Sequence, residues 1–433
     1  MDKIKELIKT RKAKIGIVGM GYVGLPLAME FSKSGFAVTG FEVDAQKVRD
    51  LNAGQSYIPD VPTAEMAAMV NKGLLSATLD FTGLKKQDAV IICVPTPLRK
   101  SKDPDVSYIV ASVQETRKYL KRGQIIILES TTYPGTTKEL VKPMLETGGL
   151  KAGRDFYLAF SPERVDPGNK KYGVKNTPKV VGGLTPACTE LAGLLYGAVI
   201  DRVLEVSNTE TAELVKLLEN TFRAVNIGMM NEMALMCNKL GLDVWEVIGA
   251  AASKPFGFMP FFPGPGIGGH CIPLDPHYLG WKMKTLNFEP RFIELAGAIN
   301  SSMPDHVVAR LGEILNTRGK ALSRSKILMI GMAYKPDIAD PRESPARDVL
   351  ILLEKTGAKA DYYDPYVAET DLGEGEVRRS SKDALKKIKN YDCVMIVTPH
   401  SCIDYVKIAK TARLVFDTRN ATKGLKGKNI FRL

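Results

Sequence analysis

Hydrophobic and polar positions in the first third of the chain alternate between short apolar runs and amphipathic stretches. The apolar runs lie at residues 14–18, 37–41, 88–94 and 124–128 and have the length of buried parallel strands. Each run ends in a turn rich in Gly, Ser, Thr, Pro or acidic residues, and stretches of helical character separate the runs. Strands that alternate with helices predict a doubly wound parallel sheet, which binds ligands at the carboxyl ends of its strands.

The middle of the chain changes to a helical period. Asn208 or Thr209 can cap a helix that continues to a stop at Gly241. A second helical segment is expected over residues 289–317, interrupted by Pro304, because proline removes a backbone hydrogen bond. Long helices between two α/β units commonly build a subunit interface, so we expect a homodimer or a higher homo-oligomer.

The strand pattern returns near the C-terminus, at residues 326–330, 360–363, 392–397 and 413–416. These runs repeat the order of the N-terminal part, which is a strand, a glycine turn at Gly331, and a second strand that ends in an acidic residue. The repeat predicts a second Rossmann-like domain that lacks the full glycine fingerprint.

Together these patterns predict an α/β protein with two Rossmann-like, doubly wound parallel-sheet domains joined by a central helical region with long helices. We expect an N-terminal dinucleotide-binding domain at 1–206, a helical domain at 207–317 and a C-terminal Rossmann-like domain at 318–433. The acids that end the second strand of each sheet, Glu42 and Asp364, support the match between the two domains. Two clefts of this type suggest two nucleotide-bearing ligands.

Composition and net charge narrow the chemical class of ligand that the protein can bind. The 433 residues are 45% hydrophobic and 25% charged, which is typical of a globular protein. The 60 Lys and Arg residues outnumber the 48 Asp and Glu residues, and a net charge of +12 favours anionic ligands. Because the basic residues are scattered and form no long tract, we expect small phosphate-bearing ligands and no nucleic acid.

The sequence shows no sign of membrane insertion or secretion. The longest uncharged run, 255–274, contains five prolines, and a lipid-spanning helix cannot tolerate so many unpaired backbone groups. Residues 1–14 lack the apolar stretch of a signal peptide. The six cysteines form no C-x-x-C pair, which indicates free thiols in a reducing compartment. We therefore expect a cytoplasmic protein with no membrane partner.

A dinucleotide fingerprint follows the first predicted strand. It has the form G-x-G-x-x-G and consists of Gly19, Met20, Gly21, Tyr22, Val23 and Gly24. The glycines allow a tight turn, close approach to a pyrophosphate and close helix packing. Glu42 can bind both ribose hydroxyls and would repel a 2′-phosphate, so we expect NAD rather than NADP. Thr96 and Thr131 follow the next strands and are further candidates for cofactor contacts.

A glycine-rich loop leads into the candidate nucleophile. Cys271 comes directly after this loop, and if it opens a helix, the helix dipole would favour its thiolate. We interpret the other five cysteines as small buried hydrophobic residues. Zinc is a weaker interpretation of His270, Cys271, Asp275 and His277, because adjacent ligands rarely reach one ion and no second Cys/His group exists. We expect no metal.

Lys216 and Asn220 are four residues apart on the first long helix, so both project from one face. An ammonium group beside an amide suits a developing oxyanion. From this helix alone, however, a solvated polar stripe is the simpler interpretation.

At this point the sequence resembles the nucleotide-diphosphate-sugar 6-dehydrogenases, which oxidise the sugar C6 alcohol to a carboxylate using two NAD. The resemblance extends from Gly19 to Asn420. It rests on five ordered motifs: residues 19–26, residues 161–169, residues 213–220, Gly268-Gly269-His270-Cys271 with Asp275, and Lys335 followed by Arg342-Glu343-Ser344-Pro345.

The resemblance implies roles for individual residues. Cys271 would attack the C6 aldehyde and form a thiohemiacetal that is oxidised to a thioester. Lys216 and Asn220 would stabilise the oxyanions, Asp275 and Thr131 would hold the catalytic water, and Glu163 would be the general acid/base of thioester hydrolysis. Arg342 would lie near the cofactor. The implied UDP-sugar contacts are Glu163, Arg164, Lys216, Asn220, Phe262, Gly264, Gly268, Lys335 and Arg419.

The substrate is inferred from departures within these motifs. Arg164-Val165 follow Glu163, whereas members that act on UDP-glucose typically have an apolar pair there. This resembles the 2-acetamido-sugar branch. Within that branch, the segment 255–276, with Pro273, is most similar to the UDP-N-acetylglucosamine 6-dehydrogenases. UDP-GalNAc, UDP-ManNAc and UDP-glucose are the alternatives.

Two other classes of protein compete with this interpretation. One is a two-electron NAD dehydrogenase in which Cys271 is structural and Lys216 with Asn220 performs the acid/base chemistry. The other is a sensor that binds NAD or a nucleotide-sugar without turnover. The expected residue type at each candidate catalytic position disfavours the sensor.

Overall fold

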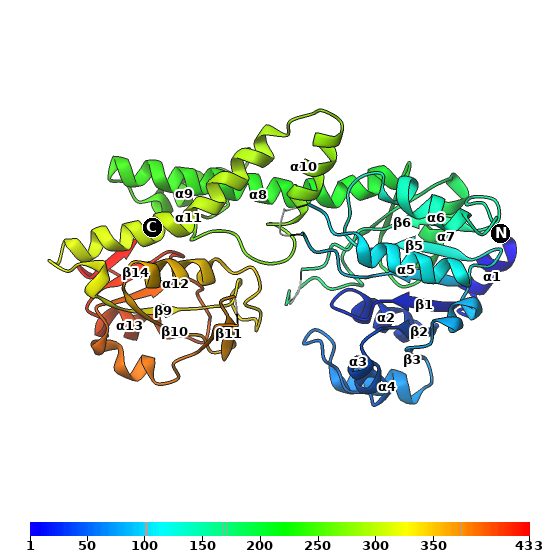
Figure 1. Cartoon of the computed structure of the whole chain (residues 1–433), viewed down its shortest axis with the longest axis horizontal. Coiled ribbons are helices and arrows are strands. Elements are labelled where there is room, and N and C mark those ends of the chain that lie inside the picture. The colour runs from blue at the N-terminus through cyan, green and yellow to red at the C-terminus, as the bar shows by residue number, and fades with distance from the viewer. Residues whose placement is uncertain (100–102, 167, 170, 374) are drawn as a thin grey trace. The chain divides into compact units, whose positions relative to one another are not determined.

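The computed structural model describes residues 1–99, 103–166, 168–169, 171–373 and 375–433, so Pro167 of the 161–169 motif lies outside the described residues. Contacts within the chain define two compact units (Figure 1). The first consists of Met1–Glu219 and His277–Phe288, and the second of Asn220–Pro276 and Glu289–Leu433.

The first unit contains a sheet with eight described strands in the order β3-β2-β1-β4-β5-β6-β7-β8. All neighbouring strands are parallel except β6 and β7. The strands are β1 (Lys14–Val18), β2 (Ala37–Phe41), β3 (Leu75–Thr78), β4 (Ala89–Ile92), β5 (Ile125–Leu128), β6 (Tyr157–Phe160), β7 (Lys179–Gly183) and β8 (Val203–Val206). The predicted strands are therefore confirmed. β4 is shorter than expected at both ends, and β5 begins one residue later than expected.

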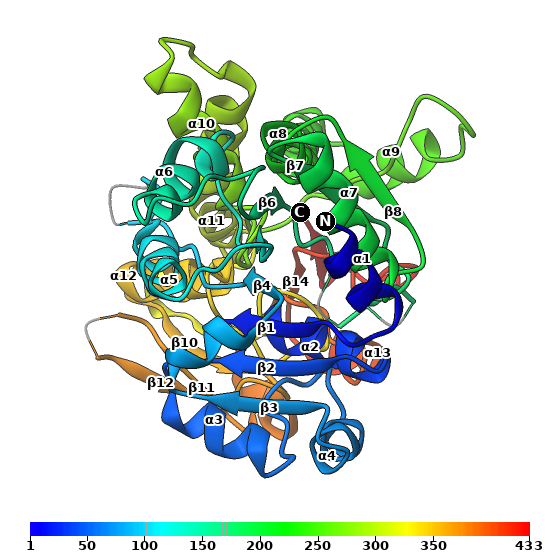
Figure 2. The ribbon, with the colours of Figure 1, turned by 90° about the vertical axis from the view of Figure 1, so that its right-hand side faces the viewer.

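Helices lie on both faces of this sheet. They are α1 (Asp2–Lys9), α2 (Gly24–Lys33), α3 (Ala45–Asn52), α4 (Thr63–Asn71), α5 (Ser107–Lys118), α6 (Lys142–Glu146) and α7 (Pro186–Gly197), with single turns η1 (Phe81–Lys86) and η2 (Thr136–Val141). Figure 2 shows β1, β2 and β3 side by side, with α3 and α4 near the edge strand β3.

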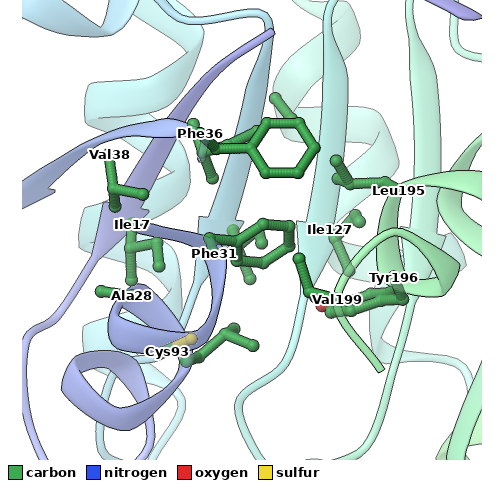
Figure 3. Packing of buried hydrophobic residues seen from close by; sticks show 14 of the residues in the cluster. Ile17, Ala28, Phe31, Phe36, Val38, Cys93, Ile127, Leu195, Tyr196 and Val199 are labelled. Carbon is green, nitrogen blue, oxygen red and sulfur yellow. The ribbon is translucent and has the colours of Figure 1, made fainter. Parts of the chain in front are cut away.

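One of the two large apolar clusters of the first unit lies between β1, β4 and β5 and the helices α2 and α7. Phe31 of α2 packs edge-on against Phe36 with ring centroids 5.6 Å apart, and its other neighbour is Tyr196 of α7 at 6.2 Å (Figure 3). Ile17 and Ile127 are buried in the same cluster. Burying one such side chain stabilises the fold by about 1.5–3 kcal/mol, so this cluster holds the strand ends at fixed spacing.

Long helices follow the first sheet: α8 (Thr209–Leu240), α9 (Val244–Ala251), α10 (Asp275–Thr285) and α11 (Arg291–Asn316). The predicted start and stop of α8 are confirmed, since Asn208 Oδ1 accepts a bond from the Thr211 N–H group (2.8 Å) and Gly241 has a φ of +68°. The predicted interruption at Pro304 is wrong. Helix α11 continues through this buried proline because apolar side chains on both sides of it, including Met303 and Val307, are also buried.

In the second unit, α8 packs closely against α11. A Cβ atom at Gly228 would lie 3.2 Å from the Cβ atom of Ala296, so the two helices approach to backbone distance. Asn300 of α11 accepts a hydrogen bond from Asn231 (2.8 Å) and donates one to the Ala224 carbonyl (3.1 Å). Among the described residues, none of the helices is both long and apolar enough to cross a membrane.

A second parallel sheet, in the order β10-β9-β13-β14-β15, completes the second unit. Its strands are β9 (Lys326–Ile330), β10 (Lys359–Tyr363), β13 (Cys393–Ile396), β14 (Val415–Asp417) and β15 (Ile430–Arg432). The other elements are α12 (Pro345–Lys355), α13 (Tyr405–Thr411), the turns η3 (Leu322–Arg324) and η4 (Ala384–Asn390), and an antiparallel hairpin of β11 (Glu369–Asp371) and β12 (Val377–Arg379). The hairpin was not expected from the sequence.

The predicted repeat between the two sheets is confirmed in detail. The Gly19 N–H group donates to the Phe41 carbonyl (2.8 Å), and the Gly331 N–H group donates to the Tyr363 carbonyl (2.9 Å). Gly19 and Gly331 have nearly identical left-handed φ values of +90° and +91°. Both sheets therefore turn from the first strand into the following segment in the same way.

Candidate active site

The glycine turn between β1 and α2 has the shape that a pyrophosphate requires. A Cβ atom at Gly24 would lie 1.9 Å from the Gly19 carbonyl oxygen, and one at Gly19 would lie 2.8 Å from the Cys93 carbonyl oxygen. No chain atom lies within 4 Å of a Cβ built at Gly21, so the backbone there is open to approach. No side chain caps α2, which suits an anionic ligand at this helix start.

Glu42 occupies the position expected for ribose recognition. Its carboxylate is 7% exposed and accepts hydrogen bonds from the N–H groups of Met20 (2.9 Å) and Val43 (2.8 Å). These bonds fix the carboxylate beside the glycine turn at the end of β2. The turn and the carboxylate therefore fit a dinucleotide with free ribose hydroxyls, which is NAD.

The neighbouring fingerprint residues and Thr96 line the same end of the sheet. Tyr22 is exposed and Val23 is half-buried. The Thr96 carbonyl accepts a hydrogen bond from the hydroxyl of buried Tyr278 (3.0 Å), which ties the loop after β4 to α10. The glycine turn belongs to the first unit and Arg342 to the second, so these two candidate cofactor contacts do not lie within one unit.

Lys216 and Thr131 meet in the first unit, as the resemblance implies. The Lys216 ammonium donates to Thr131 Oγ1 at 2.6 Å, and the Lys216 residue is 9% exposed. Lys216 also contributes to the electrostatic environment of Glu163. Three of the six candidate catalytic residues are thus gathered where β5, β6 and α8 converge, which argues against a solvated polar stripe on α8.

Glu213 is a buried residue of this region for which the sequence suggested no role. Its carboxylate accepts hydrogen bonds from the N–H groups of Gly135 (2.6 Å) and Thr137 (2.8 Å) and from the Thr137 hydroxyl (2.7 Å). Burial raises its pKa to about 7. Glu213 holds the loop that contains Thr131 against α8, one turn before Lys216. The position of Glu213 at the start of the 213–220 motif was the available signal.

Glu163 lies just after β6 and its carboxylate is fully engaged. Oε1 accepts the N–H groups of Arg164 (2.7 Å) and Val165 (2.6 Å), and Oε2 lies 3.4 Å from Lys179 Nζ. Burial favours the neutral acid, but Lys179 and the hydrogen bonds outweigh it and lower the pKa of Glu163 to about 2. Arg164 pairs with Glu219 (2.6 Å) and donates to the Pro178 carbonyl (2.6 Å), so it also orders this segment.

The second unit brings together Asn220, Asp275 and Cys271. The Asn220 amide donates to Asp275 Oδ2 and accepts a bond from Arg223. The Asp275 N–H group donates to the Cys271 carbonyl at 2.8 Å. The condition that Cys271 opens a helix is not met, because α10 begins at Asp275 and Cys271 lies in the turn before it. Cys271 is exposed and buried Asp275 is fixed beside it.

The remaining cysteines mostly match the prediction of buried hydrophobic residues. Cys93, Cys188, Cys237 and Cys393 are buried, and burial raises the pKa of the Cys93 and Cys393 thiols. Cys402 is exposed, so the prediction is wrong for this residue, which lies in the loop before α13.

The glycine-rich loop encloses Arg419. Burial lowers the pKa of the Arg419 guanidinium to about 10. A Cβ atom at Gly264 would lie 2.3 Å from Arg419 Nη1, and Arg419 Nη2 donates to the Gly266 carbonyl (3.4 Å). A Cβ at Gly268 would lie 2.7 Å from the Glu343 carbonyl. The glycines at 264 and 268 therefore make room for neighbouring groups. Phe262 is 55% exposed and stacks on Trp245.

Arg342 and Lys335 lie on loops of the second sheet. Arg342 forms two hydrogen bonds with Asp340 (2.9 and 2.8 Å), and His270 reaches the same carboxylate at 3.0 Å. Burial raises the pKa of Asp340, but His270 and Arg342 outweigh this effect, so the pKa lies below its usual value. Asp340 thus connects Arg342 to the residue before Cys271, while half-buried Lys335 follows the Gly331 turn.

Family models match most of the chain. The models describe the NAD binding, central and UDP binding domains of the UDP-glucose/GDP-mannose dehydrogenase family, and they match residues 13–200, 210–302 and 328–424, respectively. The first match covers the glycine turn and Glu163, and the second covers Lys216, Asn220 and Cys271.

Individual relatives are similar over most of their length. A UDP-N-acetyl-D-glucosamine 6-dehydrogenase of Pseudomonas aeruginosa is 36% identical over 83% of this chain and 84% of its own. A UDP-N-acetyl-D-mannosamine dehydrogenase of Pyrococcus horikoshii is 33% identical over 95% of this chain and 96% of its own.

Solved structures share the fold. A UDP-D-ManNAc dehydrogenase from Pyrococcus horikoshii has a TM-score of 0.87 and 33% identity over 97% of this chain and 98% of its own. An NDP-N-acetyl-D-galactosaminuronic acid dehydrogenase from Methanosarcina mazei has a TM-score of 0.83 and 32% identity over 100% and 97%. The names of these relatives cover several sugars.

We predict that Glu42→Ala weakens NAD binding by about 10- to 100-fold, because a charged hydrogen bond to ribose contributes about 1.5–3 kcal/mol. The loss should be smaller for NADP, whose phosphate the carboxylate repels. Calorimetric titration with both dinucleotides measures the change, and Asp364→Asn in the second sheet is the matched control. An unchanged ratio of the two affinities would contradict the assignment of Glu42.

Proposed function

This chain belongs to the UDP-glucose/GDP-mannose dehydrogenase family, and we propose that it oxidises the C6 hydroxyl of UDP-N-acetylglucosamine to the carboxylate through a thioester on Cys271. One alcohol, two NAD⁺ and one water would yield one carboxylate, two NADH and three protons. The observation that supports this best is an exposed thiol beside an aspartate that is fixed by Asn220 of α8.

Lys216 and Asn220 would stabilise oxyanions, and Thr131 would help to orient the reacting oxygen. When bound, NAD supplies the acceptor for each of the two hydrides. Lys216 and Asn220 lie one helical turn apart on α8, and their ammonium and amide groups would stabilise the negative oxygen at C6 during both oxidations. The half-buried Thr131 hydroxyl, which Lys216 contacts, would orient the reacting hydroxyl or water.

Cys271 would retain the aldehyde between the two oxidations. Its thiolate adds to the carbonyl carbon, forms a C–S bond and leaves the oxygen as an alkoxide that becomes a thiohemiacetal. Oxidation of this adduct gives the thioester. A water molecule held by Asp275 and Thr131 would then add to the thioester carbonyl, with Glu163 as its base.

We predict that the wild-type protein forms two NADH per UDP-N-acetylglucosamine at completion, and that Cys271→Ser forms one or none. The reason is that the serine hydroxyl is a weaker nucleophile than the thiolate, and the hemiacetal that it could form with the C6 aldehyde is oxidised less readily than a thiohemiacetal. Absorbance of NADH at complete substrate consumption measures the ratio. Cys402→Ser, which removes the other exposed thiol, should keep a ratio of two.

Other ratios would identify the competing classes. One NADH in both wild type and Cys271→Ser would favour a two-electron dehydrogenase with a structural cysteine. NAD binding without turnover on any of the four UDP-sugars would favour a sensor.

The acetamido sugar is supported by the Arg164-Val165 pair and by relatives named for UDP-GlcNAc, UDP-ManNAc and GalNAc-derived substrates. We predict that kcat/KM for UDP-N-acetylglucosamine exceeds that for UDP-glucose by at least about tenfold. The reason is that polar groups of a pocket built for the 2-acetamido group lose their hydrogen-bond partners when the substrate has a hydroxyl there. Steady-state kinetics with UDP-GlcNAc, UDP-GalNAc, UDP-ManNAc and UDP-glucose tests this. A higher value for any other sugar would reassign the substrate.

We further propose that the protein is a homodimer or higher homo-oligomer through α8. In the second unit this helix exposes Phe222, Met229 and Met236 at intervals of seven residues, followed by Leu240. A seven-residue apolar stripe is suited to packing against a second helix. We also propose a cytoplasmic location, consistent with six free cysteines, which cell fractionation can test.

We predict that Met229→Asp converts the oligomer to a monomer, because it places a charge in the apolar stripe. Light scattering coupled to size-exclusion chromatography measures the mass. Val377→Asp, at a 53% exposed apolar position on β12, should leave the mass unchanged. A wild-type protein that is already monomeric would contradict the proposed interface.

A further inference from the structure

A buried ionic cluster lies where the carboxyl ends of β5 and β6 meet the start of β7. Lys179 Nζ contacts Glu129 Oε1 and lies 3.4 Å from Glu163 Oε2. Glu129 follows β5, Glu163 follows β6, and Lys179 begins β7. Glu129 and Lys179 were not among the candidates from the sequence.

The reversal of one strand explains why these three residues meet. β5 and β6 are parallel, so their carboxyl ends point to the same edge of the sheet. β7 is antiparallel to β6, with Phe160 opposite Gly182, so its first residue comes to that same edge. The Ser161 hydroxyl bonds the Val180 carbonyl (2.8 Å) and continues this alignment beyond the strand.

The cluster is sealed from water on the side of α7. Glu129 and Lys179 are 1% and 4% exposed, and Tyr196 is fully buried. The Tyr196 hydroxyl donates to Glu129 Oε2 at 2.5 Å. Cys93 at the end of β4 and Lys216 on α8 are the other titratable groups that face the cluster.

Burial and mutual repulsion favour a proton on one of the two carboxyl groups. Lys179 contacts both carboxylates, Lys216 adds a further positive charge near Glu163, and no cation other than Lys179 has a described contact with Glu129. Because Lys179 Nζ contacts both carboxylates, the charge on one of them affects the protonation of the other. Burial raises the pKa of Glu129 to about 7, against the pull of Lys179. The proton therefore resides on Glu129 up to neutral pH.

We propose that Lys179 and Glu129 are positioning residues for Glu163. Lys179 orients and ionises the Glu163 carboxylate, and Glu129 is the partner with which Glu163 exchanges its proton. This inference rests on the proposed function, because it concerns the hydrolysis of the thioester. It adds two residues to the reaction that contact neither substrate nor cofactor.

The geometry defines what each residue does in that step. The water oxygen bonds the thioester carbonyl carbon, the C–S bond breaks with its electron pair on the Cys271 sulfur, and the water proton moves to Glu163. Glu163 Oε1 is held by two backbone N–H groups. Oε2 and Glu129 Oε1 both contact Lys179 Nζ, so a proton taken up by Glu163 can be passed to an ionised Glu129 through this ammonium, which donates one proton to Glu129 and accepts one from Glu163.

Above neutral pH, Glu129 is ionised and the cluster can accept this proton. We therefore expect the wild-type rate of thioester hydrolysis to increase as the pH rises through about 7. In Glu129→Gln, Glu163 beside Lys179 stays ionised and has no proton partner, so the rate should become independent of pH between about 6 and 8 and fall roughly 10- to 100-fold. In Lys179→Met, loss of the cation should shift the midpoint to higher pH.

The test is a stopped-flow measurement of NADH formation at several pH values, with intact-mass detection of the sugar thioester on Cys271. Both variants should form the thioester and accumulate it, since only its hydrolysis is slowed. Lys179→Arg should restore much of the rate. Asp155→Asn is the matched control, because Asp155 is a buried, ion-paired carboxylate at the opposite end of β6.

The two proposals fail in distinguishable ways. A wild-type protein that forms one NADH and no thioester overturns the proposed function. An infrared titration without substrate tests the shared proton directly. Glu213, whose pKa is also about 7, contributes a protonated carboxyl band to both proteins, so the signal is the additional band that disappears near pH 7 in wild type and is absent in Glu129→Gln. Carboxyl bands of equal intensity in wild type and Glu129→Gln overturn the inference. A normal pH profile in both variants, with a thermal stability lowered as in Asp155→Asn, also overturns it and makes the cluster structural.

Discussion

Hydrogen bonds from backbone N–H groups to buried or partly buried carboxylates hold three loops of the candidate site. Glu42 fixes the glycine turn, Glu213 fixes the loop after β5, and Glu163 fixes its own segment after β6. Such bonds are stronger than neutral ones, and a buried N–H group that loses its acceptor is destabilising by about 1–3 kcal/mol. Each carboxylate therefore determines a backbone path as well as a charge.

The same device distinguishes the two Rossmann-like sheets. Asp364, the counterpart of Glu42, accepts N–H groups from Met332, Ala333, Tyr366 and Val367 and also contacts His400 at 2.9 Å. Both of its oxygens are therefore committed within the chain. Glu42 accepts bonds mainly from its own turn and from Met20. Asp364 thus closes a loop that extends to Val367, whereas the Glu42 carboxylate fixes the glycine turn and the two residues that follow Glu42.

The antiparallel strand β7 has an effect on chemistry beyond its place in the sheet. In a fully parallel sheet the start of β7 would lie at the edge opposite the carboxyl ends of β5 and β6, and a lysine there could not meet their acids. Reversal of β7 brings a buried cation, Lys179, into contact with both carboxylates. The arrangement makes their protonation states dependent on each other.

The sequence by itself determined the local features. Apolar runs predicted the strands, the caps predicted α8, and the glycine fingerprint with Glu42 predicted the dinucleotide turn, because each depends on residues close together in the chain. It could not show that α11 continues through Pro304, that α10 starts four residues after Cys271, or that Glu129 and Lys179 pair across 50 positions. Those features depend on burial and on strand pairing between distant segments. Only the tertiary structure decides which distant polar groups are brought out of water together, and therefore which charges must share a partner or a proton.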